Sequence, residues 1–151
     1  MIELRLQTEV HSTAETVFDA LADLRAYDRW LARSASFPGI TEISPGPIAA
    51  GTTFVESEPN GVRHGTVTEL QSPTRIAFHQ PMTMKRRALG TVDIDVGYTL
   101  TAKGASVHVD RLVHLGLPWP LKAVRPLVVR KFHREGQRTL LALKSFAETQ
   151  R

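Results

Sequence analysis

The sequence contains no cysteine among its 151 residues. Disulfide bonds, thiolate metal sites and a cysteine nucleophile are therefore excluded. It also has no run near the roughly 18 consecutive apolar residues that a membrane-spanning helix needs. The first residues, Ile2 to Gln7, alternate apolar and polar side chains, unlike the basic and then apolar order of a signal peptide. We therefore expect a soluble, cytoplasmic protein.

Sequence motifs for metals and phosphates are missing as well. The six histidines stand at positions 11, 64, 79, 108, 114 and 133, without the HxH or HExxH spacing that brings two rings to one metal. The glycines fall in expected strands and turns, whereas a phosphate-binding loop places them before a helix. We therefore expect neither a metal nor a cofactor.

The composition is that of an ordinary globular protein, with 42% hydrophobic and 23% charged residues. The length suits a single domain spanning residues 1–151 with one core. The net charge of +4 is compatible with an acidic partner and equally with a solvated surface. Charge alone does not decide between these two interpretations.

A long amphipathic helix is predicted near the end of the chain, over residues 127–147. Its apolar or small residues recur at steps of three and four, so they share one face: Val128, Phe132, Gly136, Thr139, Leu140, Leu143, Phe146 and Ala147. A helix with one apolar face can cover an antiparallel sheet whose other face is solvated. A cavity between sheet and helix is then expected.

Two shorter helical segments are predicted after the first strand. Ser12 to Glu15 has the form of a capping box, with Ser12 as the N-cap. The helix that follows has an apolar stripe of Val17, Phe18, Leu21 and Leu24. Residues 25–32 indicate a second short helical turn.

Seven strands are predicted from runs rich in β-branched and aromatic residues, separated by turn sequences such as Pro59-Asn60-Gly61 and Lys103-Gly104. The runs are Ile2–Thr8, Ser36–Ile43, Thr52–Glu58, Arg63–Leu70, Arg75–Gln80, Leu89–Thr101 and Ser106–Leu115. The predicted fold is therefore α+β, a seven-stranded antiparallel sheet wrapped around the long C-terminal helix.

Several short segments carry a resemblance to a known family. They are Ala14–Asp23, Tyr27–Leu31, Gly65–Leu70, Ser72–Arg75, the Gly104 turn before Val107, and Leu143–Phe146. With the order of elements, they resemble the SRPBCC superfamily of START/Bet v 1-like helix-grip proteins, in its polyketide cyclase/dehydrase and lipid-transport-like branch. The resemblance covers nearly the whole chain. It implies a cavity for a hydrophobic or amphipathic ligand, and catalysis in only some members.

The last two strands supply the most specific site prediction. A turn centred near Lys103-Gly104 predicts that Arg111 lies opposite Val96. The same register places Tyr98 opposite Val109, and alternation then turns Arg111 and Tyr98 toward the apolar face. A buried arginine needs a carboxylate, an anion or a carbonyl-rich ligand. The alternatives are a one-residue slip, which would expose Arg111, and a core tyrosine whose hydroxyl is satisfied by protein.

Other side chains are candidates for the lining of the cavity. Aromatic residues and methionine suit an apolar ligand, although simple core packing accounts for them equally well: Trp30, Phe37, Phe54, Phe78 and Met84. His64 is a candidate general base if its face of the strand is the inner one. An exposed histidine is the alternative.

Basic residues suggest an anionic partner. The predicted C-terminal helix carries Arg130, Lys131, Arg134 and Arg138 away from its apolar face, and Lys85-Arg86-Arg87 forms a second cluster. These residues could contact an anionic membrane surface, or they could be the solvated side of an amphipathic helix. Nucleic acid is disfavoured because no recognition motif accompanies the charge.

The leading hypothesis is a protein that binds a small hydrophobic or aromatic ligand, such as a lipid, quinone or polyketide-like molecule. One alternative is a polyketide cyclase/aromatase-type enzyme in which Arg111 and Tyr98 hold carbonyl or enolate oxygens. A second is an interaction module with a filled cavity and a basic helix. Binding is favoured because the sequence shows no acid–base pair near the expected cavity.

Overall fold

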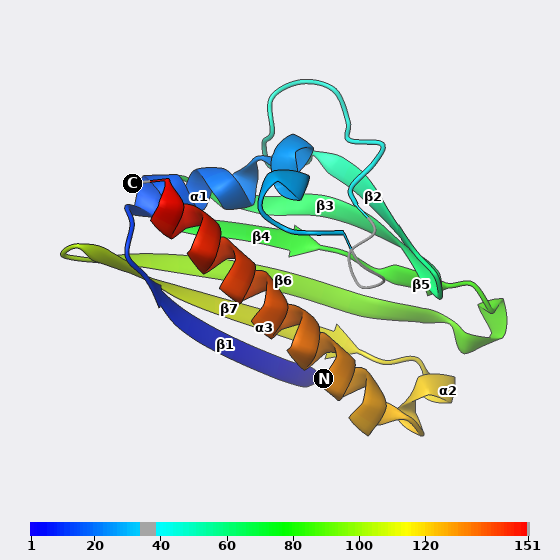
Figure 1. Ribbon diagram of the computed structural model, residues 1–151. Helices are drawn as coiled ribbons and strands as arrows, with labels where there is room; N and C mark the ends of the chain where they lie inside the picture. Colours follow the sequence, from blue (N-terminus) through cyan, green and yellow to red (C-terminus); the bar gives the residue numbers. More distant parts are fainter. Residues whose placement is uncertain (34–38, 151) are drawn as a thin grey trace.

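A curved antiparallel sheet packs one face against the C-terminal helix α3 (Figure 1). The computed structural model describes residues 1–33 and 39–150. Its strands are β1 (Ile2–Val10), β2 (Thr53–Glu58), β3 (Gly61–Gln71), β4 (Arg75–His79), β5 (Met82–Met84), β6 (Thr91–Lys103) and β7 (Ser106–Gly116). Its helices are α1 (Ala14–Ala22), α2 (Trp119–Lys122) and α3 (Arg125–Thr149), with 3₁₀ helices η1 (Leu24–Arg29) and η2 (Arg87–Leu89). The predicted α+β fold is confirmed.

The sheet pairs its first strand, β1, with its last, β7. Its strand order is β1-β7-β6-β4-β3-β2, and β5 pairs with β3 and β6. Burial alternates along β7, which shows one face turned to the core and one to solvent. Figure 1 shows α3 crossing the concave face of the sheet. Within the described residues, no helix is long and apolar enough to cross a membrane.

The first helix begins one residue later than predicted. Thr13, and not Ser12, is the N-cap, and its hydroxyl accepts a hydrogen bond from the Thr16 amide at 3.1 Å. Ser12 instead donates its amide to the Val10 carbonyl, which closes the turn out of β1. The correction leaves the apolar stripe in place, because Val17, Phe18 and Leu21 are all buried.

The predicted strand Ser36–Ile43 is not a strand where the structure describes it. Residues 36–38 lie outside the described residues, and residues 39–43 contribute only an isolated bridge between Thr41 and Val55. Gly39 and Glu42 have positive φ angles of 108° and 49°, which are incompatible with extended pairing. The seventh strand is β5, a three-residue segment too short to show a pattern in the sequence.

The last hairpin is shifted by two residues from the predicted register. Tyr98 lies opposite Arg111, and Leu100 lies opposite Val109. The turn is centred one residue later than expected, on Gly104 and Ala105, since Lys103 pairs with Ser106, and Gly104 adopts a φ of 60°. A shift of two preserves the face of every side chain, so Arg111 still points to the core.

The predicted helix 127–147 lies inside α3, and the predicted face is the buried one. Its buried residues are Phe132, Gly136, Thr139, Leu140, Leu143 and Ala147. Pro126 occupies the first turn, where its missing amide hydrogen breaks no helical hydrogen bond. The periodicity of the sequence thus predicted both the helix and the side that meets the sheet.

Gly65 provides a test of the packing beneath the sheet. It lies opposite Phe54, and a Cβ at Gly65 would come within 2.2 Å of the Phe54 ring. Phe54 is 2% exposed and meets Phe78 edge to face at 6.0 Å between ring centroids. We expect Gly65→Ala to lower the free energy of unfolding by about 1–3 kcal/mol, because the added methyl group would force the buried Phe54 ring out of its packed position.

Chemical denaturation measures this change. Thr68→Ala, at an exposed position on the same strand, is the control and should change stability by no more than about 0.5 kcal/mol. A neutral or stabilising Gly65→Ala would show that the Phe54 ring can move.

Candidate functional site

A small cavity lies between the sheet, η1 and α3. Its volume is about 50 Å³, enough for a few waters and well below the roughly 300 Å³ of a typical small-molecule site. Charged residues and tyrosines share its wall with apolar side chains. The lining residues are Leu24, Tyr27, Leu31, Ile40, Phe54, Glu56, Arg63, Phe78, Gln80, Val96, Tyr98, Arg111, Glu135 and Thr139.

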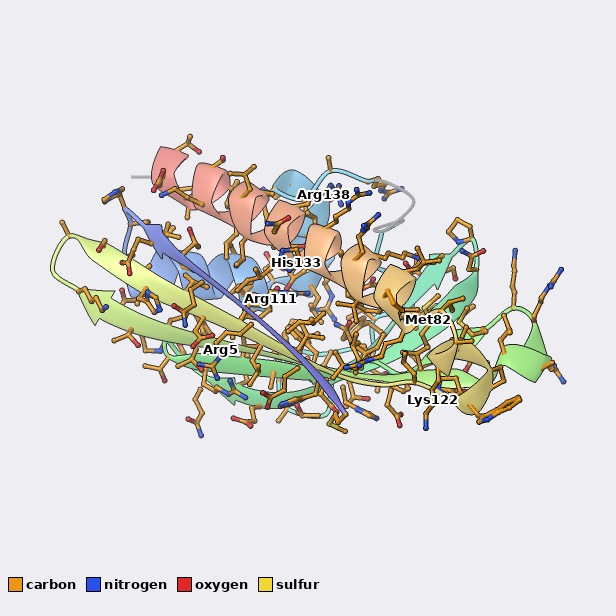
Figure 2. The ribbon with its side chains drawn as sticks, turned by 90° about the horizontal axis from the view of Figure 1, so that it is seen from below. Arg5, Met82, Arg111, Lys122, His133 and Arg138 are labelled. Carbon is orange, nitrogen blue, oxygen red and sulfur yellow. The ribbon has the colours of Figure 1, made fainter. Side chains whose placement is uncertain are left out.

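Arg111 is a buried cation without a carboxylate partner. It is 6% exposed, and its Nε donates a hydrogen bond to the Tyr98 hydroxyl at 3.1 Å. Within residues 1–33 and 39–150 it forms no ion pair. Figure 2 shows Arg111 in the space between the sheet and α3. The helix leaves room because residue 136 is glycine, whose added Cβ would lie 2.6 Å from Nη1 of Arg111.

Arg63 is the opposite case, a buried cation with two carboxylates. Its Nε donates to Glu58 Oε2 at 2.7 Å and its Nη2 to Glu135 Oε2 at 3.1 Å. It also lies over the Phe132 ring, with Cζ 5.3 Å from the centroid. Burial alone would lower the pKa of Arg63, but the surrounding carboxylates outweigh it and raise the pKa above its ordinary value. Arg63 thus joins β2, β3 and α3 at one point.

Glu56 is a buried acid that titrates near neutral pH. It is 6% exposed, and desolvation raises its pKa to about 7, with Glu135 and Glu58 adding to the rise and Arg63 opposing it. In the described part of the chain its carboxyl has no hydrogen-bond partner. Near pH 7 the cavity therefore contains a group able to accept or release a proton.

Four of the eight predicted site residues meet in this cavity. Phe54, Phe78, Tyr98 and Arg111 all line it. They come from β2, β4, β6 and β7; the last three are neighbours in the sheet, and β3 lies between β4 and β2. The predicted inward face of the last hairpin is what unites Tyr98 with Arg111.

Three of the other four lie elsewhere, and the fourth is not among the described residues. Trp30 is buried, donates its indole hydrogen to the Ala20 carbonyl at 3.2 Å and lines a separate groove beside α1. His64 is exposed on the outer face of β3, because Arg63 and Gly65 take the inner positions. Met84 is half-buried on β5, outside the cavity lining. Phe37 lies outside the described residues.

Sequence reasoning missed the acids and the second arginine of the cavity. Glu56 and Glu58 follow Phe54 at steps of two, so placing Phe54 inward implies that both acids point inward too. Glu135 is the only acid between residues 117 and 147, and it directly precedes buried Gly136. The parity of β2 was therefore an available signal, whereas the pairing with Arg63 was not.

Comparison with known proteins assigns this chain to a family. A family model described as "Polyketide cyclase / dehydrase and lipid transport" matches residues 1–148. The chain belongs to this polyketide cyclase/dehydrase and lipid transport family. No curated protein matches the sequence. The family description names two kinds of role, catalysis on polyketides and transport of lipids, and both involve hydrophobic ligands.

Solved structures show the same fold. The di-domain ARO/CYC StfQ from the steffimycin biosynthetic pathway aligns with a TM-score of 0.76 at 10% identity, over 98% of this chain and 51% of that one. The chain therefore spans about half of that di-domain protein. Ara h 8.0201 aligns with a TM-score of 0.71 at 14% identity, covering 98% of both chains.

A further match is protein MLL2253 from Mesorhizobium loti, with a TM-score of 0.70, 14% identity and 95% coverage of both chains. At these identities the likeness establishes the fold alone. This polyketide cyclase/dehydrase and lipid transport family member thus has the SRPBCC helix-grip fold, and its chemistry must be argued from its own cavity.

Removal of Arg63 tests its central position. Arg63→Met would leave Glu58 and Glu135 buried without their cation, and we expect a loss of about 3–5 kcal/mol in the free energy of unfolding. The control is Arg5→Met, which breaks the Arg5–Asp110 pair, where the arginine side chain is 56% exposed; it should cost no more than about 1 kcal/mol. If urea denaturation shows the same loss of stability for Arg63→Met and Arg5→Met, the central role of Arg63 is contradicted.

The raised pKa of Glu56 gives a prediction for stability against pH. Below pH 4.5 the carboxyl is protonated in both folded and unfolded states, and between 4.5 and about 7 only the folded state keeps the proton. Wild-type stability should therefore fall with rising pH across this window by about 3 kcal/mol relative to Glu56→Gln. Denaturation of both proteins at several pH values measures the difference, and a difference independent of pH would contradict it.

Proposed function

We propose that the protein binds a small, mainly apolar ligand that carries an anionic or carbonyl oxygen, with that oxygen at Arg111 and Tyr98. The observation that supports this most is the burial of Arg111 at 6% exposure with a tyrosine hydroxyl as its hydrogen-bond partner. An unpaired buried charge is costly, so the folded protein gains when a ligand oxygen supplies the missing partner.

The remaining wall suits the body of such a ligand. Phe54, Phe78 and Val96 form its floor on the sheet, and Leu24 and Leu31 face them. Aromatic and aliphatic surfaces of this kind favour a lipid chain, a quinone ring or a polyketide-like molecule. The family description, which names polyketides and lipids, supports the first and last of these ligand classes.

A ligand larger than a few waters requires the wall to move. The sheet side is held by continuous strand pairing, whereas η1 contains a non-helical residue, Ala26. Hydrogen bonds fasten η1: the Tyr27 hydroxyl donates to the Leu21 carbonyl at 2.5 Å, and Arg25 donates to the carbonyls of Ser44 and Gly46. We infer that η1 moves outward when a ligand enters.

A polyketide cyclase-type enzyme is the second candidate, and Glu56 is the observation that favours it. An acid with a pKa of about 7 lines the same cavity as Arg111 and Tyr98. Ionised Glu56 would remove a proton from the carbon beside a ligand carbonyl, while Arg111 and Tyr98 stabilise the enolate oxygen. The enolate carbon would then attack a second carbonyl, and the alkoxide would take up a proton before water is lost.

Binding is tested first by mass spectrometry of the purified protein under native and denaturing conditions. We expect a co-purified lipid, quinone or aromatic acid, and Arg111→Leu should weaken its binding at least tenfold because a charge-assisted hydrogen bond is lost. Arg5→Leu, at an exposed position, is the control. If Arg111→Leu binds the ligand with unchanged affinity, Arg111 does not contact the ligand.

Catalysis is tested by the exchange of hydrogen for deuterium at the carbon between the carbonyls of a 1,3-diketone, followed by NMR. For an enzyme, the catalysed rate should rise through about pH 7 in the wild type and should be lost in Glu56→Gln. A pure carrier would keep its ligand in both proteins and catalyse no exchange in either. Equal catalysed exchange in both proteins would exclude Glu56 as the base.

A further inference from the structure

One end of the molecule is formed by η2 with the loop before it, α2 and the first turns of α3. Figure 1 shows these segments gathered at the same end, and Figure 2 places Lys122 there. They pack closely, since a Cβ at Gly90 would lie 2.9 Å from Pro118 Cβ. We call the exposed residues of this end the tip surface: Lys85, Arg86, Arg87, Trp119, Lys122, Val124, Arg125 and Leu127.

The tip surface exposes large apolar side chains. Trp119 is 83% exposed, Leu127 64% and Val124 39%. Among the described residues only five large hydrophobic side chains are exposed, and three of them lie in this one segment. Trp119 therefore does not contribute to the core, and leaving it in water forfeits the free energy that its burial would provide.

The charge of the tip surface has one sign. Its five charged side chains are all cations, and neither residues 84–92 nor residues 117–134 include an acid. The acid nearest to the tip surface in sequence is Asp93. Its Cβ lies 3.3 Å from where a Cβ of Gly116, the last residue of β7, would be. Solvent-exposed cations grouped in this way attract a dense anionic surface.

We propose that the tip surface docks on an anionic membrane surface. Tryptophan prefers the boundary between head groups and acyl chains, and lysine and arginine beside it pair with acidic head groups. The aliphatic side chains of Val124 and Leu127 favour a bilayer over nucleic acid, whose phosphates and base edges offer them nothing to bury against.

The basic residues of α3 that were expected to face a membrane differ in their exposure to solvent. Arg130, Lys131 and Arg134 are exposed and extend the positive charge away from the tip. Arg138 is half-buried and donates to the Ala32 carbonyl, so it is engaged within the protein. Docking is therefore centred on Trp119 and Lys122 of α2, which precedes α3, and not on the middle of α3.

Co-sedimentation with vesicles tests the proposal on the full chain. We expect binding to vesicles of mixed phosphatidylcholine and phosphatidylglycerol at low salt, weaker binding at high salt, and little to phosphatidylcholine alone. Trp119 fluorescence should shift to the blue on binding, while buried Trp30 gives a constant background. Absence of binding to the anionic vesicles at low salt would overturn the proposal.

Matched substitutions locate the contact. Lys122→Gln should weaken binding about fivefold, whereas Lys103→Gln, which removes the same charge from the hairpin turn of β6 and β7, should leave it unchanged. Trp119→Ala should weaken binding further and abolish the blue shift. Equal effects of the two lysine changes would show general charge attraction and refute a specific tip.

Two further readouts distinguish membrane docking from nucleic-acid binding and from ligand capture in the cavity. An oligonucleotide duplex that binds at the tip while vesicles do not would assign the surface to nucleic acid and overturn the membrane proposal. The tip surface shares no residue with the cavity lining. Arg111→Leu should therefore weaken ligand binding in the cavity and leave vesicle binding unchanged. Thermal melts of all variants confirm that the exposed substitutions preserve folding.

Discussion

The buried ion pairs of Arg63 are the constraint on which the rest of the cavity depends. One guanidinium joins Glu58 of β2 and Glu135 of α3 to β3, so the helix is fixed over the sheet by a directional contact as well as by apolar packing. The carboxylates of Glu58 and Glu135 both pair with Arg63. Arg111 lines the same cavity from β7, and its hydrogen bond within the described part of the chain goes to the Tyr98 hydroxyl.

The contrast between the two arginines gives the cavity its chemistry. A helix-grip fold with a purely apolar interior would hold a ligand by shape and burial alone. Here Arg111, which forms no ion pair within residues 1–33 and 39–150, shares a small space with Glu56, whose pKa is about 7, and with aromatic rings between sheet and helix. Such a site favours ligands with a polar oxygen, and it provides the acid–base group that the sequence by itself did not reveal.

The proposed ligand site and the proposed docking surface lie in different parts of the molecule. The cavity lies beneath the middle of α3, whereas the exposed Trp119 and Lys122 belong to α2, which precedes that helix. The exposed Arg125 and Leu127 at the start of α3 extend the docking surface, while the buried face of α3 packs toward the sheet. A protein that collects a hydrophobic molecule from a membrane would need both features, and either can be tested without the other.

Local pattern determined the helices, most strands and the inward face of Arg111, because three- and four-residue or two-residue periodicity is a property of neighbouring residues. The predicted face of Arg111 was correct even though the predicted hairpin register was wrong, because a shift of two residues leaves each side chain on the same face of the sheet. Only the tertiary structure decided the pairing of Arg63 with Glu135, the isolation of Arg111 and the raised pKa of Glu56. Those properties depend on desolvation and on contacts between residues that are up to 72 positions apart in the chain.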